Sequence, residues 1–181
     1  MPESSIIFTD TPLGLMWLWA TELGLCGVGF GDSVERSLLR RMARFGIGSP
    51  EPVRTPLLDR AKTQLLTYYD RQEDAFDLPL DLRGTDFQHK VWERLRGVPY
   101  GEKTSYGEIA LMLGIPNGSQ AVGQAVGANP VAIIVPCHRV VGAGGALIGY
   151  AGGTERKAAL LELEQAGLQL RLQLRLPPPF W

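Results

Sequence analysis

The chain has 181 residues, a length that suits one large domain or two small domains packed together. Hydrophobic residues make up 45% of it and charged residues 20%, an ordinary globular mixture that excludes a disordered chain and a fibrous repeat. The formal net charge of -1 excludes a global basic field, so any binding to nucleic acid must rest on a local surface. The 22 glycines and 13 prolines predict many turns and short elements, and therefore a mixed α/β fold.

The number of cysteines and the length of the apolar stretches indicate the cellular compartment. The two cysteines cannot make a disulfide framework, and no apolar stretch approaches the roughly 20 residues that span a bilayer. The first ten residues lack the basic segment and apolar run of a secretory signal. We therefore expect a cytoplasmic protein in a reducing environment, with no membrane partner.

Residues 1–84 are interpreted as a supporting α/β domain. Residues 6–30 are short apolar runs broken by turns, a pattern typical of a β-meander. Helices are predicted over 34–45 and 56–69, and a further strand over 76–83. The domain carries 9 basic and 12 acidic residues and no pattern of catalytic residues, which is typical of a solvated supporting unit.

The pattern changes at Thr85, where the sequence Thr-Asp-Phe-Gln has the form of a capping box and predicts a helix ending near Gly97. A second capping box at 105–108 predicts a short helix, and residues 119–128 predict another helix after a turn. Two short helices separated by a tight turn indicate a helix-turn-helix, and we place a second domain at 85–168.

The second helix of this predicted pair has unusually small side chains. Its sequence is SQAVGQAVGA, and the longer segment 109–154 contains no acidic residue and one basic residue, Arg139. Small side chains allow either tight packing against a neighbouring element or close approach to the narrow minor groove of DNA. A segment without acidic residues can lie against phosphates without repulsion.

Cys137 is the candidate nucleophile. Residues 131–135 form an apolar run that predicts a buried strand, which would lead into the sequence Pro-Cys-His-Arg at 136–139. Buried cysteines are usually inert, and Cys26, inside an apolar run, is assigned to the core. Cys137 differs because a histidine and an arginine beside it can favour the thiolate. Adjacent strand residues point to opposite faces, so Cys137 and His138 can cooperate only through a backbone turn or a bridging water.

A histidine that acts as a base needs a third group, most often a carboxylate, to fix its tautomer. On the predicted last helix, Glu164 lies one turn beyond Leu160 and Leu161, whereas Glu162 neighbours Glu155 and Ala158. This spacing favours Glu164 as the inward-facing carboxylate, with a solvated glutamate near Lys157 as the alternative.

The sequence gives no basis for a metal or a nucleotide cofactor. His89, His138 and the two cysteines lack the clustered spacing of a closed zinc site. The glycine-rich segment 142–153 lacks the lysine pattern of a phosphate loop. We therefore expect neither group.

Seven short motifs between residues 87 and 153 together form a highly specific pattern. They are Phe87-Gln88 with Val91-Trp92, Pro99-Tyr100-Gly101, Ser105-Tyr106-Gly107, Ala121-Val122-Gly123, Asn129-Pro130, Ile-Val-Pro-Cys-His-Arg-Val at 134–140, and Gly-Tyr-Ala-Gly-Gly at 149–153. With these motifs the chain resembles the O6-alkylguanine-DNA alkyltransferases, which are self-sacrificing DNA repair proteins. A weaker match at 11–14 extends the resemblance to nearly the whole chain before Gly167.

The resemblance implies an N-terminal α/β domain similar to ribonuclease H and a mainly α catalytic domain with a winged helix-turn-helix. It implies irreversible, in-line transfer of an alkyl group from O6 of guanine, and from O4 of thymine, to Cys137, after the damaged base has flipped out of the duplex. Each molecule would act once, as a methylated-DNA-[protein]-cysteine S-methyltransferase without a cofactor. The implied partner is double-stranded DNA containing O6-alkylguanine, bound by a monomer.

The resemblance also implies a role for each matching residue. Cys137 is the nucleophile, His138 accepts its proton through a water, and Glu164 orients His138. Asn129 braces the active-site turn, and Tyr106 helps to rotate the nucleotide and hydrogen-bonds the guanine. The implied guanine pocket comprises Val140, Tyr150, Ala151 and Gly152, and the implied DNA contacts are Gln120, Ala121, Gly123 and Arg139.

Two positions depart from the family pattern. Gln120 stands where an intercalating arginine is expected, and glutamine lacks the planar cation that stacks on bases and attracts phosphates. Ala151 stands where the pocket often carries a serine. A weakly active protein that binds or senses alkyl lesions is therefore the alternative function. A cysteine hydrolase is disfavoured, because it needs an oxyanion hole and a histidine remote in sequence, and only His89 is available.

Residues 169–181 form a C-terminal tail that the resemblance does not explain. Leucine alternates there with glutamine or arginine, which suits an amphipathic strand, and a frayed terminus is the alternative. We assign the tail no role.

Overall fold

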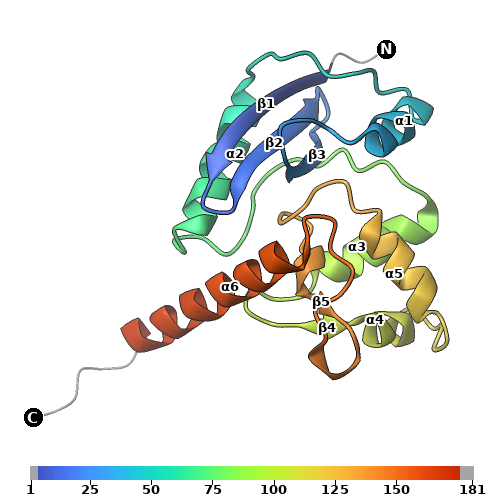
Figure 1. Ribbon diagram of the computed structural model, residues 1–181, viewed down its shortest axis with the longest axis vertical. Helices are drawn as coiled ribbons and strands as arrows, with labels where there is room; N and C mark the ends of the chain where they lie inside the picture. The colour runs from blue at the N-terminus through green and yellow to red at the C-terminus, as the bar shows by residue number, and fades with distance from the viewer. Residues whose placement is uncertain (1–3, 176–181) are drawn as a thin grey trace, which may run out of the picture.

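The computed structural model describes residues 4–175 of the chain. Its N-terminal part is an antiparallel sheet of three strands in the order β1 (Ser4–Thr11), β2 (Gly14–Thr21) and β3 (Leu25–Phe30) (Figure 1). The predicted β-meander is therefore confirmed. The tight turn between β1 and β2 ends at Gly14, whose φ of 106° lies in the region that glycine adopts without strain.

Helices cover both faces of this sheet. Helix α1 (Arg36–Arg44) packs with Trp17 and Trp19, whereas α2 (Pro56–Tyr69) packs with the alternate residues Met16 and Leu18. The alternation follows from strand geometry, in which successive side chains point to opposite faces. Both predicted helices are confirmed.

The predicted strand over 76–83 is wrong, because this segment meets the sheet at a single bridge between Leu25 and Leu80. Leu25 N donates to the carbonyl of Pro79 at 2.9 Å, and Asp81 N donates to the carbonyl of Leu25 at 2.8 Å. Pro79 has no N–H group with which to extend a ladder.

The C-terminal part is mainly helical. Helices α3 (Asp86–Arg96) and α4 (Tyr106–Met112) both begin with the capping boxes that the sequence predicts. Helix α5 (Ser119–Gly127) packs against α3 and α4, and the pair α4–α5 forms the helix-turn-helix. The two-residue strands β4 (Thr104–Ser105) and β5 (Val140–Val141) pair in parallel beside it.

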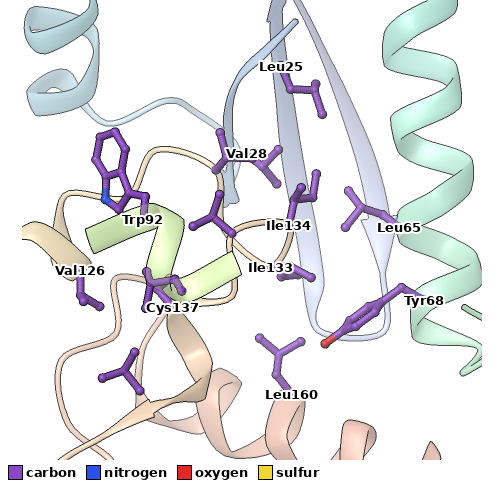
Figure 2. Packing of buried hydrophobic residues seen from close by; sticks show 14 of the residues in the cluster. Leu25, Val28, Leu65, Tyr68, Trp92, Val126, Ile133, Ile134, Cys137 and Leu160 are labelled. Atoms are coloured by element: carbon purple, nitrogen blue, oxygen red, sulfur yellow. The ribbon is translucent and has the colours of Figure 1, made fainter. Parts of the chain in front are cut away.

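The predicted strand over 131–135 is also wrong. Val131 bridges to Val28 of β3, but Ile133 has a φ of 71° and the chain turns there. The apolar run is buried as predicted, and its side chains belong to one cluster with Cys137 and with residues of the sheet (Figure 2). This segment therefore joins the sheet to the reactive loop through a shared core.

Helix α6 (Thr154–Arg175) extends seven residues into the predicted tail, so the strand interpretation is wrong for 169–175 (Figure 1). Leucine, glutamine and arginine are strong helix formers, and the helix continues although it leaves Leu170 and Leu172 exposed. Arg171 anchors it by pairing with Asp74. The remainder of the tail, 176–181, lies outside the described residues. Among residues 4–175, no helix combines the length and apolar character needed to cross a membrane.

Candidate active site

Cys137 lies in a turn of 3₁₀-helix, Cys137–Arg139, that directly follows Pro136. Cooperation between Cys137 and His138 was expected to need either a backbone turn or a bridging water. The structure has a backbone turn at this position. Asn129 holds this turn: its Nδ2 donates to the carbonyl of Val135 at 2.8 Å and to Sγ of Cys137 at 3.1 Å.

At neutral pH the thiol form of Cys137 is favoured over the thiolate. Burial raises its pKa, and the hydrogen bond from Asn129 and the positive charge of Lys157 oppose that rise without cancelling it. Neighbouring groups therefore favour the thiolate, as expected, but burial outweighs them. Reaction of Cys137 with an electrophile requires a base that removes the proton. Cys26 is fully buried, and its pKa is raised to about 12, in agreement with its assignment to the core.

His138 has the geometry of that base. It is fully buried, and its Nε2 lies 2.8 Å from Oε1 of Glu164. Burial lowers the pKa of His138, and the Glu164 carboxylate only partly restores it, so the imidazole is neutral at pH 7. Because an ionised carboxylate can only accept, Nε2 carries the proton and Nδ1 is the acceptor. Nδ1 is buried and has no hydrogen-bond partner among the described residues.

Glu164 faces inward on α6, as predicted, and its carboxylate accepts hydrogen bonds from four other residues. Burial alone would raise its pKa, but hydrogen bonds from His138 and Arg139 and the positive charge of Arg139 lower it to about 2. Arg139 donates through Nε at 3.0 Å and through Nη2 at 2.8 Å. The backbone N–H of Gly101 donates at 3.1 Å and the Tyr68 hydroxyl at 2.8 Å.

Arg139 does not lie on a DNA-binding surface, which corrects the role that the resemblance implied for it. It is 6% exposed, and besides its bonds to Glu164 its Nη1 donates to the carbonyl of Val98 at 2.6 Å. The reason is the buried carboxylate, because an unpaired charge in the core would be costly.

Two residues of this site were missed in the sequence. Tyr68 comes from α2 in the N-terminal domain, and nothing local connects it with Glu164. Lys157 was considered only as a neighbour of Glu164, but it is fully buried, with Nζ 2.5 Å from the carbonyl of Ile148. Its spacing of three and four residues before Leu160 and Leu161 was an available signal for the inner face of the helix.

The same Ile148 carbonyl also accepts the Tyr106 hydroxyl at 3.1 Å. Two donors from different helices therefore hold the loop that leads into Tyr150. Tyr106 thus contacts the glycine-rich segment 142–153 from α4.

A cavity of about 360 Å³ contains Cys137 and extends to the N-terminal domain. Of the predicted pocket residues, Tyr150, Ala151 and Gly152 line it, whereas Val140 is buried in β5 and does not. The Tyr150 hydroxyl is buried without a partner among the described residues. The remaining walls come from β3, α1 and α5, and from single residues elsewhere: Trp17, Glu35, Asn129, Pro130, Ala132, Gly149 and Arg156.

Helix α5 presents an uncharged face to solvent. Gln120 and Ala121 are exposed, Gly123 lies close to the Tyr106 ring, and Val122 and Ala125 are buried. The packing interpretation thus fits the buried side of the helix. The exposed side is small enough for close approach to a partner.

Two family models match this chain: the ribonuclease-like domain of 6-O-methylguanine DNA methyltransferase over residues 6–82, and its DNA-binding domain over 86–166. The chain belongs to the 6-O-methylguanine DNA methyltransferase family. The predicted resemblance and the predicted fold class are therefore confirmed.

Mycobacterial members of the 6-O-methylguanine DNA methyltransferase family are similar to this chain. A methylated-DNA–protein-cysteine methyltransferase of Mycobacterium bovis is 58% identical over 106 residues, which cover 59% of this chain and 64% of the relative. One from Mycolicibacterium paratuberculosis is 50% identical over 162 residues, covering 86% of this chain and 89% of the relative. The crystal structure of Mycobacterium tuberculosis OGT in complex with DNA has a TM-score of 0.76 and 43% identity, covering 90% of this chain and 94% of the other.

Proposed function

We propose that this protein repairs O6-alkylguanine in double-stranded DNA by transferring the alkyl group to Sγ of Cys137. The observation that carries the proposal is the pair of hydrogen bonds from Asn129 to Cys137 and between His138 and Glu164, beside the cavity. The similar protein whose structure is a complex with DNA supports DNA as the partner.

The chemistry follows from the protonation states. Nδ1 of His138 accepts the thiol proton through a bridging water, while the Glu164 carboxylate stabilises the resulting imidazolium. Sγ then bonds to the alkyl carbon as the bond between that carbon and O6 breaks, and the electron pair stays on guanine. The proton from the thiol ends on guanine, so atoms and charge balance. A thioether has no leaving group for water to displace, and each molecule acts once.

The base must leave the duplex to reach Cys137, since an enzyme cannot reach the reacting atom inside the stack. The small exposed face of α5 enters the minor groove, with Gln120, Ala121 and Gly123 in contact with DNA. Tyr106 assists rotation of the nucleotide, and Tyr150, Ala151 and Gly152 close over the base. The carbonyl of Cys137, a residue of the cavity wall, reads the guanine amine, and the same pocket accepts O4-alkylthymine.

One chain supplies every residue in this scheme, so a monomer suffices. The reaction consumes a free thiol, and both cysteines are free in the structure. A reducing compartment preserves such thiols, and we place the reaction in the cytoplasm.

A second candidate function is binding or sensing of alkyl lesions with weak transfer. The exposed uncharged Gln120 favours it, because this side chain offers neither cation stacking nor phosphate attraction.

Counting repaired bases separates these candidates. The protein is mixed with an excess of duplex that contains O6-methylguanine, and restored guanine is measured by nucleoside analysis. We expect one guanine per protein molecule, with Cys26→Ser unchanged and Cys137→Ser inactive. Repeated turnover, or repair by Cys137→Ser, would contradict the proposal, and lesion binding without repair would establish the sensor.

A further inference from the structure

Helix α1 concentrates positive charge that the reaction scheme does not use. Arg36, Arg40, Arg41 and Arg44 supply four of its nine residues, and the helix contains no acidic residue. At about 100° per residue, the four arginines span an arc of about 140°. Leu38 and Met42, which are buried, lie on the other side. The arginines therefore form one continuous surface, which we call the α1 arginine arc.

The α1 arginine arc has no counter-charge. Arg36, Arg40 and Arg44 are exposed, and none of the ion pairs found among residues 4–175 involves an arginine of α1. The nearest carboxylate in sequence, Glu35, accepts the hydroxyl of Ser37 at 3.2 Å. On the other face of the sheet, by contrast, the arginines of the α2 region pair with aspartates, Arg54 with Asp59 and Arg60 with Asp77.

The arc borders the reactive cavity. Ser37, Leu38 and Arg41 of α1 line the same cavity as Cys137 and the α5 residues Val126 and Gly127. In Figure 1, α1 and α5 lie on the same side of the molecule, away from α2. A nucleotide that places its base in this cavity brings its phosphates toward the surrounding rim.

Helix α5 itself brings no cation to that rim. It contains no charged residue, and Arg139, the one basic residue between 109 and 154, is buried against Glu164. Most of the affinity of a protein for DNA comes from contacts between basic side chains and phosphates. Besides Arg41, the cation on the cavity wall is Arg156 of α6, which donates to the carbonyls of Leu13 and Gly152. The exposed arginines of α1 are therefore the candidates for the phosphate contacts.

We propose that the α1 arginine arc is a second DNA contact, in which Arg36, Arg40 and Arg44 bind phosphates of the strand that delivers the damaged base. The guanidinium group suits this role because it binds phosphate oxygens in a bidentate manner. The N-terminal domain is then part of the DNA-binding surface, although its net charge is negative. The proposal rests on the proposed function in its choice of DNA as the partner.

The salt dependence of DNA binding tests the proposal. Dissociation constants for a fluorescent unmodified duplex are measured over a range of salt concentrations, for the full chain and for the triple variant Arg36→Gln, Arg40→Gln and Arg44→Gln. Each lost phosphate contact lowers the slope of log affinity against log salt by about 0.9, so we expect the slope to fall by roughly 2 to 3. Arg41 is left unchanged, because its Nε is buried.

A matched control removes the same charge from the other face of the sheet, through Arg54→Gln, Arg60→Gln and Lys62→Gln. This variant should keep the wild-type slope, and thermal unfolding checks that both variants fold. An unchanged slope in the α1 variant, or equal losses in both variants, would overturn the proposal. Methyl transfer by the wild type is measured separately, so a failure of the proposed function is recognised independently of the slopes.

Discussion

The hydroxyl of Tyr68 donates a hydrogen bond of 2.8 Å to Oε1 of Glu164, across a separation of 96 residues in the chain. Tyr68 belongs to α2 of the N-terminal domain, and Glu164 belongs to α6 beside the reactive loop. The same Oε1 lies 2.8 Å from Nε2 of His138. The N-terminal domain therefore reaches the carboxylate that sets the basicity of the histidine.

Removal of this donor should change the pH dependence of alkyl transfer. In Tyr68→Phe the Glu164 carboxylate loses a hydrogen bond and stabilises the His138 imidazolium more strongly. We expect the acidic limb of the single-turnover rate to move to higher pH by up to ~1 unit. Tyr69→Phe is the control, since the Tyr69 hydroxyl donates to the sulfur of Met16 at 3.4 Å and not to Glu164. If Tyr68→Phe loses thermal stability but the acidic limb of its pH–rate profile does not shift, Tyr68 has only a structural role.

The wild-type rate should be insensitive to pH near neutrality. Burial lowers the pKa of His138 below its ordinary value of 6.5, so the base stays neutral as pH falls through 6.5. As the pH falls below 6.5, His138 is protonated in the unfolded chain before it is protonated in the folded chain. The free energy of unfolding therefore declines below pH 6.5 and levels off below the pKa of His138 in the folded protein. Single-turnover rates from about pH 5 to pH 8 check this, and a half-maximal rate at or above pH 6.5 would contradict it.

Neutralising Glu164 should destabilise the fold. Glu164→Gln leaves Arg139 buried without its counterion, a change that costs about 3–5 kcal/mol. The matched variant Glu162→Gln alters an exposed residue of the same helix and should cost less than about 0.5 kcal/mol. Urea unfolding measures both free energies. Equal values for the two variants would show that the Arg139–Glu164 pair contributes little.

Gln120→Arg should accelerate repair in duplex DNA, because arginine restores the cation that stacks on bases and attracts phosphates. Gln124→Arg adds the same charge to the exposed face of α5 one turn later and is the control. The comparison uses single-turnover repair of a duplex with one O6-methylguanine. If Gln120→Arg repairs no faster than the control, position 120 does not limit the reaction.

Local signals in the sequence predicted the elements that local interactions determine. Both capping boxes form, since each is a reciprocal pair of hydrogen bonds within four residues. The predicted strand at 131–135 failed because the pattern reports burial but not the turn at Ile133. Apolar runs of five residues do not distinguish a strand from a buried loop.

Contacts between distant residues were beyond the reach of sequence patterns. Arg139 resembled a DNA-binding residue until the structure placed Glu164 against it, 25 residues away. Tyr68 fits the apolar face of α2, and the pattern contains nothing about a carboxylate from α6. The burial of Lys157, in contrast, was missed although the sequence contains a signal for it. Its spacing from Leu160 and Leu161 marks the inner face of its helix.

Transfer of the alkyl group to Cys137 is the step on which the proposed function depends. Intact and peptide mass spectrometry after incubation with an excess of duplex containing O6-methylguanine tests it most directly. We expect one added methyl group per chain, confined to the peptide that contains Cys137, with the Cys26 peptide unmodified. An unmodified Cys137 peptide in protein that binds the lesion, or a methyl group on another residue, would contradict it.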